Sequence, residues 1–124
     1  MSDAPLILCA DDDPDILALL ALRLERAGYR VAQAADGQEA LTLARELKPS
    51  IVVLDVMMPR LTGTEVLEAL RADPATHELP VILVSARAQQ ADVQRGMNAG
   101  ADAYLAKPFH ANELLELVEG MLGR

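Results

Sequence analysis

The stretch IVVLD at residues 51–55 decides how this chain folds. Its first four residues are apolar, in a run too short for a buried helix and without the alternation of a half-exposed strand. This pattern predicts a strand over Ile51–Leu54 that is buried on both faces, as in a parallel sheet. Other short apolar runs predict strands of the same kind at Leu6–Ala10, Tyr29–Ala34, Val81–Val84 and Ala103–Ala106. Strands of this type need helices on both faces of their sheet.

Stretches with a helical spacing of apolar residues separate these strands. Asp13 and Pro14 begin the first helix, as an N-cap followed by proline at the first helical position, and Gly28 ends it. Further helices are expected over residues 37–47, 63–72, 89–99 and 112–122. Strand and helix therefore alternate, and such units join parallel strands by right-handed crossovers. Since these units are too few for an eight-stranded barrel, we expect an α/β fold: a flavodoxin-like (βα)5 doubly wound three-layer sandwich with a five-stranded parallel sheet.

Length and charge restrict the classes of function. The 124 residues match one average domain, so a single domain is expected over residues 1–124. Acidic residues outnumber basic residues 19 to 11, giving a net charge of −8, and the basic residues are scattered singly. This argues against direct binding to nucleic acid or to an anionic membrane, because both need clustered lysine and arginine. With one cysteine, no signal-peptide pattern and no apolar run of ~20 residues, we expect cytoplasmic localisation.

Polar residues follow four of the five predicted strands. Asp11 and Asp12 follow the first strand, Asp55 the third, Ser85 the fourth and Lys107 the fifth. In an open α/β sheet, ligands bind outside the carboxyl ends of the strands, so these side chains are expected to converge. Taken singly, each has an ordinary explanation as a turn, cap or loop residue. Together they predict a site for a hard divalent cation such as Mg²⁺, which prefers oxygen ligands.

Several segments of the chain, in this order and spacing, match a known family. They are residues 6–15 (LILCADDDPD), 51–59 (IVVLDVMMP), 61–63 (LTG), 80–86 (PVILVSA) and 100–109 (GADAYLAKPF). The sequence therefore resembles the receiver domain of two-component response regulators over essentially its whole length. Each segment alone is a weak signal, but the complete series is very specific.

The resemblance implies a phosphoryl acceptor. Asp55 matches the family's acceptor, whose carboxylate attacks the phosphorus of a phosphohistidine on a sensor histidine kinase or histidine phosphotransfer protein. Asp11 and Asp12 match the acidic pair that holds Mg²⁺, or Mn²⁺ as an alternative, together with Asp55 and the backbone carbonyl of Met57. Lys107 matches the amine that neutralises the transferring group. Such a domain assists its own phosphorylation and dephosphorylation and is not an enzyme acting on a separate substrate.

The resemblance also implies a switch. Ser85 matches the hydroxyl that bonds the phosphoryl group, and Tyr104 the aromatic ring that rotates when this hydroxyl moves. The surface formed by the helix at 89–99, the strand at 103–106 and the helix at 112–122 would then repack to bind a downstream protein effector. A homodimer through the same surface is a further expectation. A cis peptide is implied between Lys107 and the proline that follows it.

Two other classes of function compete with this reading. A metal-dependent phosphohydrolase with an aspartyl-phosphate intermediate usually has a second aspartate two residues after the nucleophile, where this chain has Met57, and there is no cap domain. A pseudo-receiver adaptor would ignore phosphate, but every acidic, hydroxyl and amine position of the family's site is retained. The sequence leaves open the cognate kinase, the oligomeric state and whether the chain is a stand-alone regulator or part of a larger protein.

An apolar run over Ile16–Leu22 covers the whole circumference of the first helix, so part of it cannot face the core. Two readings remain equal: a docking surface for the phosphodonor, and a helix that is apolar without function. Cys9 is expected to be a small buried hydrophobe, His77 and His110 to be solvated, and Gly63 to set a tight turn.

Overall fold

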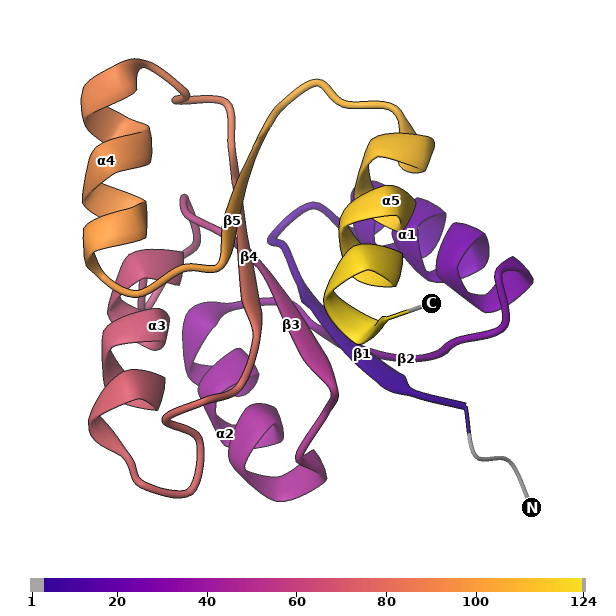
Figure 1. Ribbon diagram of the computed structural model, residues 1–124, viewed down its shortest axis with the longest axis horizontal. Coiled ribbons are helices and arrows are strands. Elements are labelled where there is room, and N and C mark those ends of the chain that lie inside the picture. The colour runs from indigo at the N-terminus through magenta and orange to yellow at the C-terminus, as the bar shows by residue number, and fades with distance from the viewer. Residues whose placement is uncertain (1–3, 124) are drawn as a thin grey trace.

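The computed structural model describes residues 4–123 as a parallel sheet between two layers of helices (Figure 1). The strands are β1 (Leu6–Ala10), β2 (Arg30–Ala34), β3 (Ile51–Asp55), β4 (Val81–Ser85) and β5 (Ala103–Ala106). They form a five-stranded sheet in the order β2-β1-β3-β4-β5, with every neighbouring pair parallel. The strand order reverses between β1 and β3, which is the doubly wound, flavodoxin-like topology expected from the alternation of strand and helix.

The helices divide between the two faces of the sheet. They are α1 (Pro14–Arg26), α2 (Gly37–Leu47), α3 (Gly63–Ala72), α4 (Gln90–Asn98) and α5 (Ala111–Leu122). Figure 1 shows α1 and α5 on one face and α2, α3 and α4 on the other. Alternate strand residues enter the two cores: Leu8 and Val52 pack beneath α2 and α3, while Ile7 and Val53 pack beneath α1 and α5. The three layers confirm the expected fold class.

Local signals fix where the helices begin. The Asp13 side chain accepts hydrogen bonds from the backbone N–H of Asp15 at 2.9 Å and of Ile16 at 3.4 Å, so it caps α1 as predicted. Gly28, with φ of 99°, follows the end of this helix. The predicted bounds of α2 and α3 are also confirmed, whereas α4 is a residue shorter at each end and α5 begins one residue earlier.

The strand ends differ slightly from the prediction. Tyr29 lies outside β2, because its N–H bonds to the carbonyl of Leu24 at the end of α1 and not to the sheet. Asp55 and Ser85 are the last residues of their strands, since they pair in the ladder with Val84 and Ala106. Both candidate site residues are therefore held by the sheet itself.

The remaining expectations about buried and exposed residues are confirmed. Cys9 is fully buried in β1, and burial raises the pKa of its thiol to about 12. His77 and His110 are exposed. In the part of the chain described, no helix combines the length and apolar character needed to cross a bilayer.

Candidate functional site

Five polar side chains lie at the carboxyl edge of the sheet, as the sequence predicts. Asp11, Asp55 and Ser85 are 3%, 5% and 0% exposed, so they lie beneath the surface, while Asp12 is exposed. One carboxylate oxygen from each of Asp11, Asp12 and Asp55 lies within 4.8 Å of the others. Lys107, directly after β5, reaches the same place. Residues up to 96 positions apart in sequence thus form one cluster.

Lys107 joins two of these carboxylates. Its Nζ donates to Oδ2 of Asp11 at 2.8 Å and to Oδ2 of Asp55 at 3.2 Å. Burial alone would lower the pKa of Lys107, but the hydrogen bonds and charges of the two aspartates outweigh burial and raise it. Its backbone N–H bonds to the carbonyl of Ser85 at 2.9 Å, and the expected cis peptide to Pro108 is present. The ammonium is therefore held in its charged form at the centre of the cluster.

The surroundings of Asp55 disfavour the ionised form of its carboxyl group. Burial, followed by the charge of Asp11, raises the pKa of Asp55 above its usual range. The Lys107 ammonium and a hydrogen bond of 3.2 Å from the Met57 N–H act in the opposite direction without cancelling this effect. An additional cation would relieve the repulsion between the carboxylates.

The donor atoms present fit a hard divalent cation. The cluster contains the carboxylates of Asp11, Asp12 and Asp55 against the single ammonium of Lys107, which leaves an excess of negative charge. All the acidic donors are oxygens, as Mg²⁺ requires. Within residues 4–123, no hydrogen bond engages the backbone carbonyl of Met57, so this oxygen is also free to act as a ligand.

Two glycines allow close backbone contacts at the two ends of the loop at residues 56–62, which follows Asp55. A Cβ at Gly63 would lie 2.4 Å from the backbone oxygen of Asp55, and a Cβ at Gly37 would lie 2.0 Å from the backbone oxygen of Leu61. Gly63 is the first residue of α3, and its N–H bonds to the carbonyl of Val56 at 2.9 Å, which closes the loop. The residue is small because two backbones touch. Gly37 was missed, although a glycine at the first position of a helix is a usable signal.

A chain of hydrogen bonds leads away from the cluster through the backbone of one residue. The Ser85 Oγ accepts a hydrogen bond from the N–H of Arg87 at 3.0 Å, and the Tyr104 hydroxyl donates to the carbonyl of Arg87 at 2.5 Å. The half-buried Tyr104 ring borders a small cavity of about 130 Å³, whose wall also includes Met57 and Thr64. Sequence reasoning named Ser85 and Tyr104 but not the backbone link between them.

An apolar groove lies directly beside the cluster. It has a volume of about 330 Å³ and runs from Lys107 along α1 and the start of α5. Its lining includes Ile16, Leu19, Pro108 and Phe109. Leu19 is 54% exposed, which confirms that part of the apolar run in α1 faces outward.

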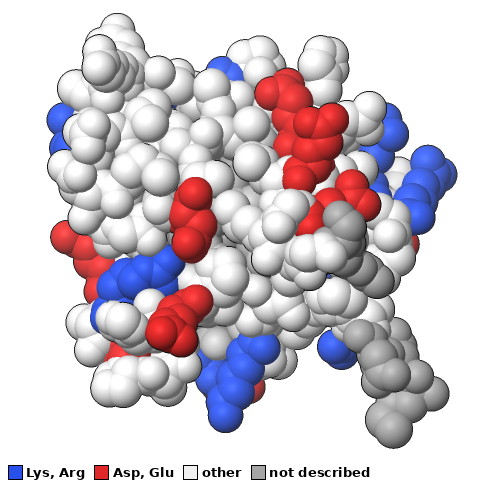
Figure 2. All heavy atoms as spheres, in the orientation of Figure 1, with Lys and Arg blue, Asp and Glu red and all other residues white. Residues whose placement is uncertain are grey.

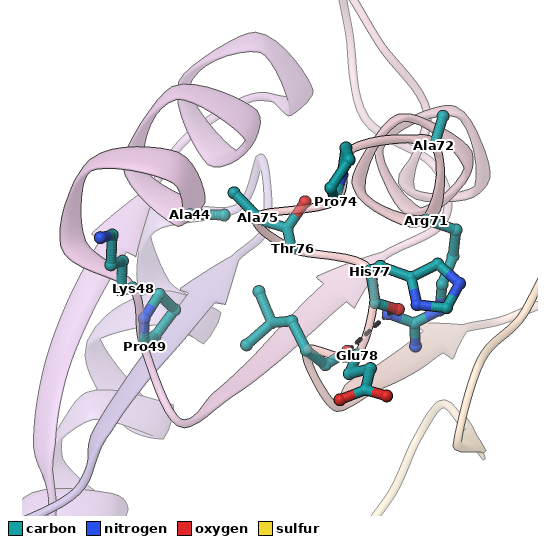
Figure 3. Close-up of a pocket in the computed structure, with 11 residues that line it drawn as sticks. Ala44, Lys48, Pro49, Arg71, Ala72, Pro74, Ala75, Thr76, His77 and Glu78 are labelled. Carbon is teal, nitrogen blue, oxygen red and sulfur yellow. Dashed lines mark hydrogen bonds between the residues drawn. The ribbon is translucent and has the colours of Figure 1, made fainter.

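A larger hollow, of about 610 Å³, lies at the opposite, amino edge of the sheet between the ends of α2 and α3 (Figure 3). Arg71 lies beside it and donates to the carbonyls of His77 and Leu79, two residues of the loop that forms one wall. The one buried polar side chain in this lining, Thr76, bonds to the carbonyl of Leu70 at 2.7 Å. Among the described residues, this hollow therefore has no buried side-chain polar atom without a partner.

The fold and this edge cluster define a class of α/β protein with an acidic cluster, able to fit a cation, at the switch point of the sheet. A family model for the response regulator receiver domain matches residues 7–119. The chain belongs to this family. Its acidic cluster fits the receiver-domain metal site.

Individual relatives agree with this assignment. The DNA-binding dual master transcriptional regulator RpaA of Synechocystis is 43% identical over 97% of this chain and 50% of its own length. The receiver domain of Francisella response regulator 1452 superposes with a TM-score of 0.91 at 36% identity, covering 97% of this chain and 98% of that one. The receiver domain of the Pseudomonas aeruginosa sensor histidine kinase PA1611, solved with a magnesium ion in its active-site cleft, has a TM-score of 0.89 at 30% identity over 98% and 99% of the two chains.

The chain spans about half the length of the curated relatives that it matches first. Several of them, RpaA and the mycobacterial MtrA proteins, are named as DNA-binding. On the face shown in Figure 2, the basic side chains of this chain lie apart from one another and acidic side chains gather over α5.

Proposed function

We propose that Asp55 accepts a phosphoryl group from the phosphohistidine of a sensor histidine kinase or histidine phosphotransfer protein. The buried Asp55 carboxylate, bonded to Lys107 Nζ and bordered by two further aspartates, is the observation that carries this proposal. An Asp55 oxygen forms the new bond to phosphorus while the phosphorus–nitrogen bond of the donor breaks, and its electron pair leaves with the imidazole. The strand end fixes the attacking group, as in-line transfer requires.

Asp11, Asp12, Asp55 and the Met57 carbonyl would hold the metal ion. Mg²⁺, or Mn²⁺ in its place, supplies charge neutralisation for the phosphoryl oxygens when bound. Support comes from the donor set and from the Pseudomonas neighbour that contains magnesium. Lys107, already held in its protonated form, contributes the remaining positive charge.

The phosphoryl group would act as a switch through Ser85. Its hydroxyl donates to a phosphoryl oxygen, and the bonds from Ser85 through Arg87 to Tyr104 carry the change toward α4. The output surface is then α4, β5 and α5, which a downstream protein effector or a second copy of the chain would bind. Charge-assisted hydrogen bonds are strong enough to bias such an equilibrium, since about 1.4 kcal/mol changes a population ratio tenfold. We further infer that residues 1–124, of which 1–3 and 124 lie outside the described residues, act as one cytoplasmic domain without direct contact to nucleic acid or membrane.

The apolar groove beside Lys107 is our proposed docking surface for the phosphodonor. It reaches the amine of the site and is walled by the outward apolar residues of α1. Leu19→Ser should slow phosphotransfer from a histidine kinase that phosphorylates the native chain but leave the rate with acetyl phosphate unchanged. Leu47→Ser, at an exposed leucine of α2 outside the groove, is the matched control. Equal slowing with both donors would contradict docking at this groove.

Incubation with acetyl phosphate and Mg²⁺ tests the acceptor. Intact-mass spectrometry of the native chain should show the mass of one added phosphoryl group, which EDTA prevents and Asp55→Asn abolishes. Modification that persists in Asp55→Asn would refute the site. Turnover of free phosphate esters would favour a phosphohydrolase, and the absence of any Mg²⁺-dependent acyl phosphate would favour an adaptor that ignores phosphate.

A further inference from the structure

Helix α4 rests on the sheet through a glycine. Gly96 is the one residue of α4 that is buried, and the others are exposed or half-buried. A Cβ at this position would lie 2.9 Å from Cδ2 and 3.0 Å from Cε2 of the Tyr104 ring, and 2.9 Å from Cδ1 of Leu83. The Leu83 methyl can shift at the end of its side chain, but the ring must leave its place or α4 must rise. The Tyr104 ring therefore occupies the space that a side chain at position 96 would need.

Glycine is a costly choice inside a helix. It lowers helix stability by about 1 kcal/mol relative to alanine, because the unfolded chain has more conformational freedom. Gly96 has no left-handed φ, so the backbone of α4 does not require it. Its use is explained by the ring beneath it.

The ring position is connected to the phosphoacceptor site through Arg87. The Tyr104 hydroxyl donates to the Arg87 carbonyl, and the Arg87 N–H donates to the Ser85 Oγ. A serine hydroxyl has one proton to donate and two lone pairs to accept with. Ser85 can therefore donate to a phosphoryl oxygen while still accepting from Arg87, and donation to an anion makes its oxygen a stronger acceptor. A phosphoryl group would thus hold the Arg87 backbone more firmly, and with it the carbonyl to which the Tyr104 hydroxyl donates.

We propose that Gly96 is a positioning residue of the switch: its missing side chain keeps open the place in which Tyr104 bonds to Arg87. This rests on the proposed phosphoacceptor function. Because coupling between two sites is reciprocal, a side chain at position 96 that displaces the ring must weaken binding of a phosphoryl group at Asp55. The effect passes through Tyr104 and Arg87, with no contact between Gly96 and the acidic cluster.

A double-mutant cycle tests the contact in the unphosphorylated protein. Gly96→Ala should lower the melting temperature of the native chain, since the new methyl group displaces the ring. In a Tyr104→Ala background the same change should raise it, because only the gain in helix stability remains. Gly120→Ala is the control, since a Cβ at this glycine of α5 meets nothing within 4 Å, and it should raise the melting temperature in both backgrounds. A fall of equal size in both Gly96 backgrounds would overturn the proposal.

Affinity for beryllofluoride, which takes the place of a phosphoryl group on a carboxylate, separates positioning from packing. At saturating Mg²⁺, Gly96→Ala should bind beryllofluoride about fivefold or more weakly, the lower end of ordinary coupling. Gly120→Ala should bind as the native chain does, and Mg²⁺ affinity measured alone should be unchanged in both. Tyr104→Phe, which keeps the ring and removes its hydroxyl, should weaken beryllofluoride binding as well.

The outcomes distinguish the role of Gly96 from the acceptor function of Asp55. Native affinity in Gly96→Ala would overturn the role of Gly96 and leave the acceptor function intact. Failure of the native chain itself to bind beryllofluoride would overturn the acceptor function, and the role of Gly96 with it. If Gly96→Ala does not fold, the folded Gly96→Ala/Tyr104→Ala chain still decides whether the clash is with the ring.

Discussion

The two edges of the sheet each place a cationic side chain among oxygen atoms, and they differ in how completely its charge is matched. At the amino edge, Arg71 makes five hydrogen bonds, one for each N–H of its guanidinium group, to Gly100, His77, Leu79 and Asp102. Four of these bonds go to the three neutral carbonyls, two of them to that of Gly100, and the fifth goes to the Asp102 carboxylate.

At the carboxyl edge, one ammonium faces three carboxylates. Lys107 bonds to Asp11 and Asp55, and Asp12 lies within reach of the same point. The pKa of Asp55 is raised, so the folded state disfavours the ionised form of this carboxyl group. At the amino edge, the hydrogen bonds of Arg71 are complete, and they hold α3, the loop before β4 and the turn before β5 together. The carboxyl edge carries an excess of negative charge, which a bound cation would balance.

Removal of the arginine should have the largest effect. Arg71→Ala should lower the free energy of unfolding by about 3 kcal/mol or more, because several partly buried carbonyls and Asp102 lose their donor together. Urea denaturation followed by circular dichroism measures this. Arg71→Lys, which keeps the charge but offers fewer donors, should recover only part of the loss. A loss under about 1 kcal/mol in Arg71→Ala would show that these hydrogen bonds contribute little to the stability of the fold.

Metal should stabilise the carboxyl edge and leave the amino edge unaffected. Mg²⁺ at 100 times its dissociation constant should add about 2.7 kcal/mol to the free energy of unfolding, since the unfolded chain does not assemble the three carboxylates. Thermal denaturation with and without EDTA shows the shift. Asp12→Asn should remove most of it, whereas Glu68→Gln, at an exposed residue of α3, should retain it. Equal Mg²⁺ stabilisation in Asp12→Asn would place the ion elsewhere.

Neutralisation of Asp55 should stabilise the metal-free protein. A raised pKa means that the folded state favours the protonated carboxyl, and this contribution is complete below the unfolded value of about 3.9 and is lost as the pH rises through the folded value. Asp55→Asn keeps the neutral form at every pH. It should therefore be more stable than the native chain at pH 7 and match it near pH 3.5. Chemical denaturation in EDTA across this range measures the difference, and a variant less stable than the native chain at pH 7 would contradict the charge excess.

The smallest effect is expected at an exposed ion pair near the amino edge. Arg45 and Asp73 approach to 3.4 Å, but their side chains are 48% and 30% exposed. Arg45→Ala should change the free energy of unfolding by less than about 0.5 kcal/mol beyond the helix preference of alanine. A change as large as that of Arg71→Ala would mean that charge, and not the number of bonded donors, determines stability at this edge.

The contrast between the edges also explains what could be predicted from the sequence. Parallel strands end at a common edge, so residues that follow separate strands must meet, and Asp11, Asp55, Ser85 and Lys107 were found on that principle alone. The alternation of strand and helix fixed the layers in the same way. Asp13 and Gly28 carried local signals for the limits of α1.

The interactions that involve the backbone could not be found in this way. The partners of Arg71 are mostly carbonyls, which every residue has, so no side-chain pattern marks them. Gly37, Gly63 and Gly96 are small because a distant segment approaches them, and hydropathy patterns record only the direction in which a side chain faces. The Arg87 link has the same character, since its backbone N–H and carbonyl, and not its side chain, connect Ser85 to Tyr104.

The rate at which the Cys9 thiol is modified can measure local opening of the fold. Cys9 is the one cysteine of the chain, it lies fully buried in β1 between β2 and β3, and burial raises its thiol pKa to about 12. The Cys9 side chain packs in the core beneath α1 and α5, with Leu17 and Leu114. A thiol reagent attacks only the thiolate, so the folded protein is protected both by these helices and by the proton on sulfur. Labelling requires α1 or α5 to open from this face of the sheet. The rate of modification by a small thiol reagent therefore reports how often this face opens, with no engineered probe.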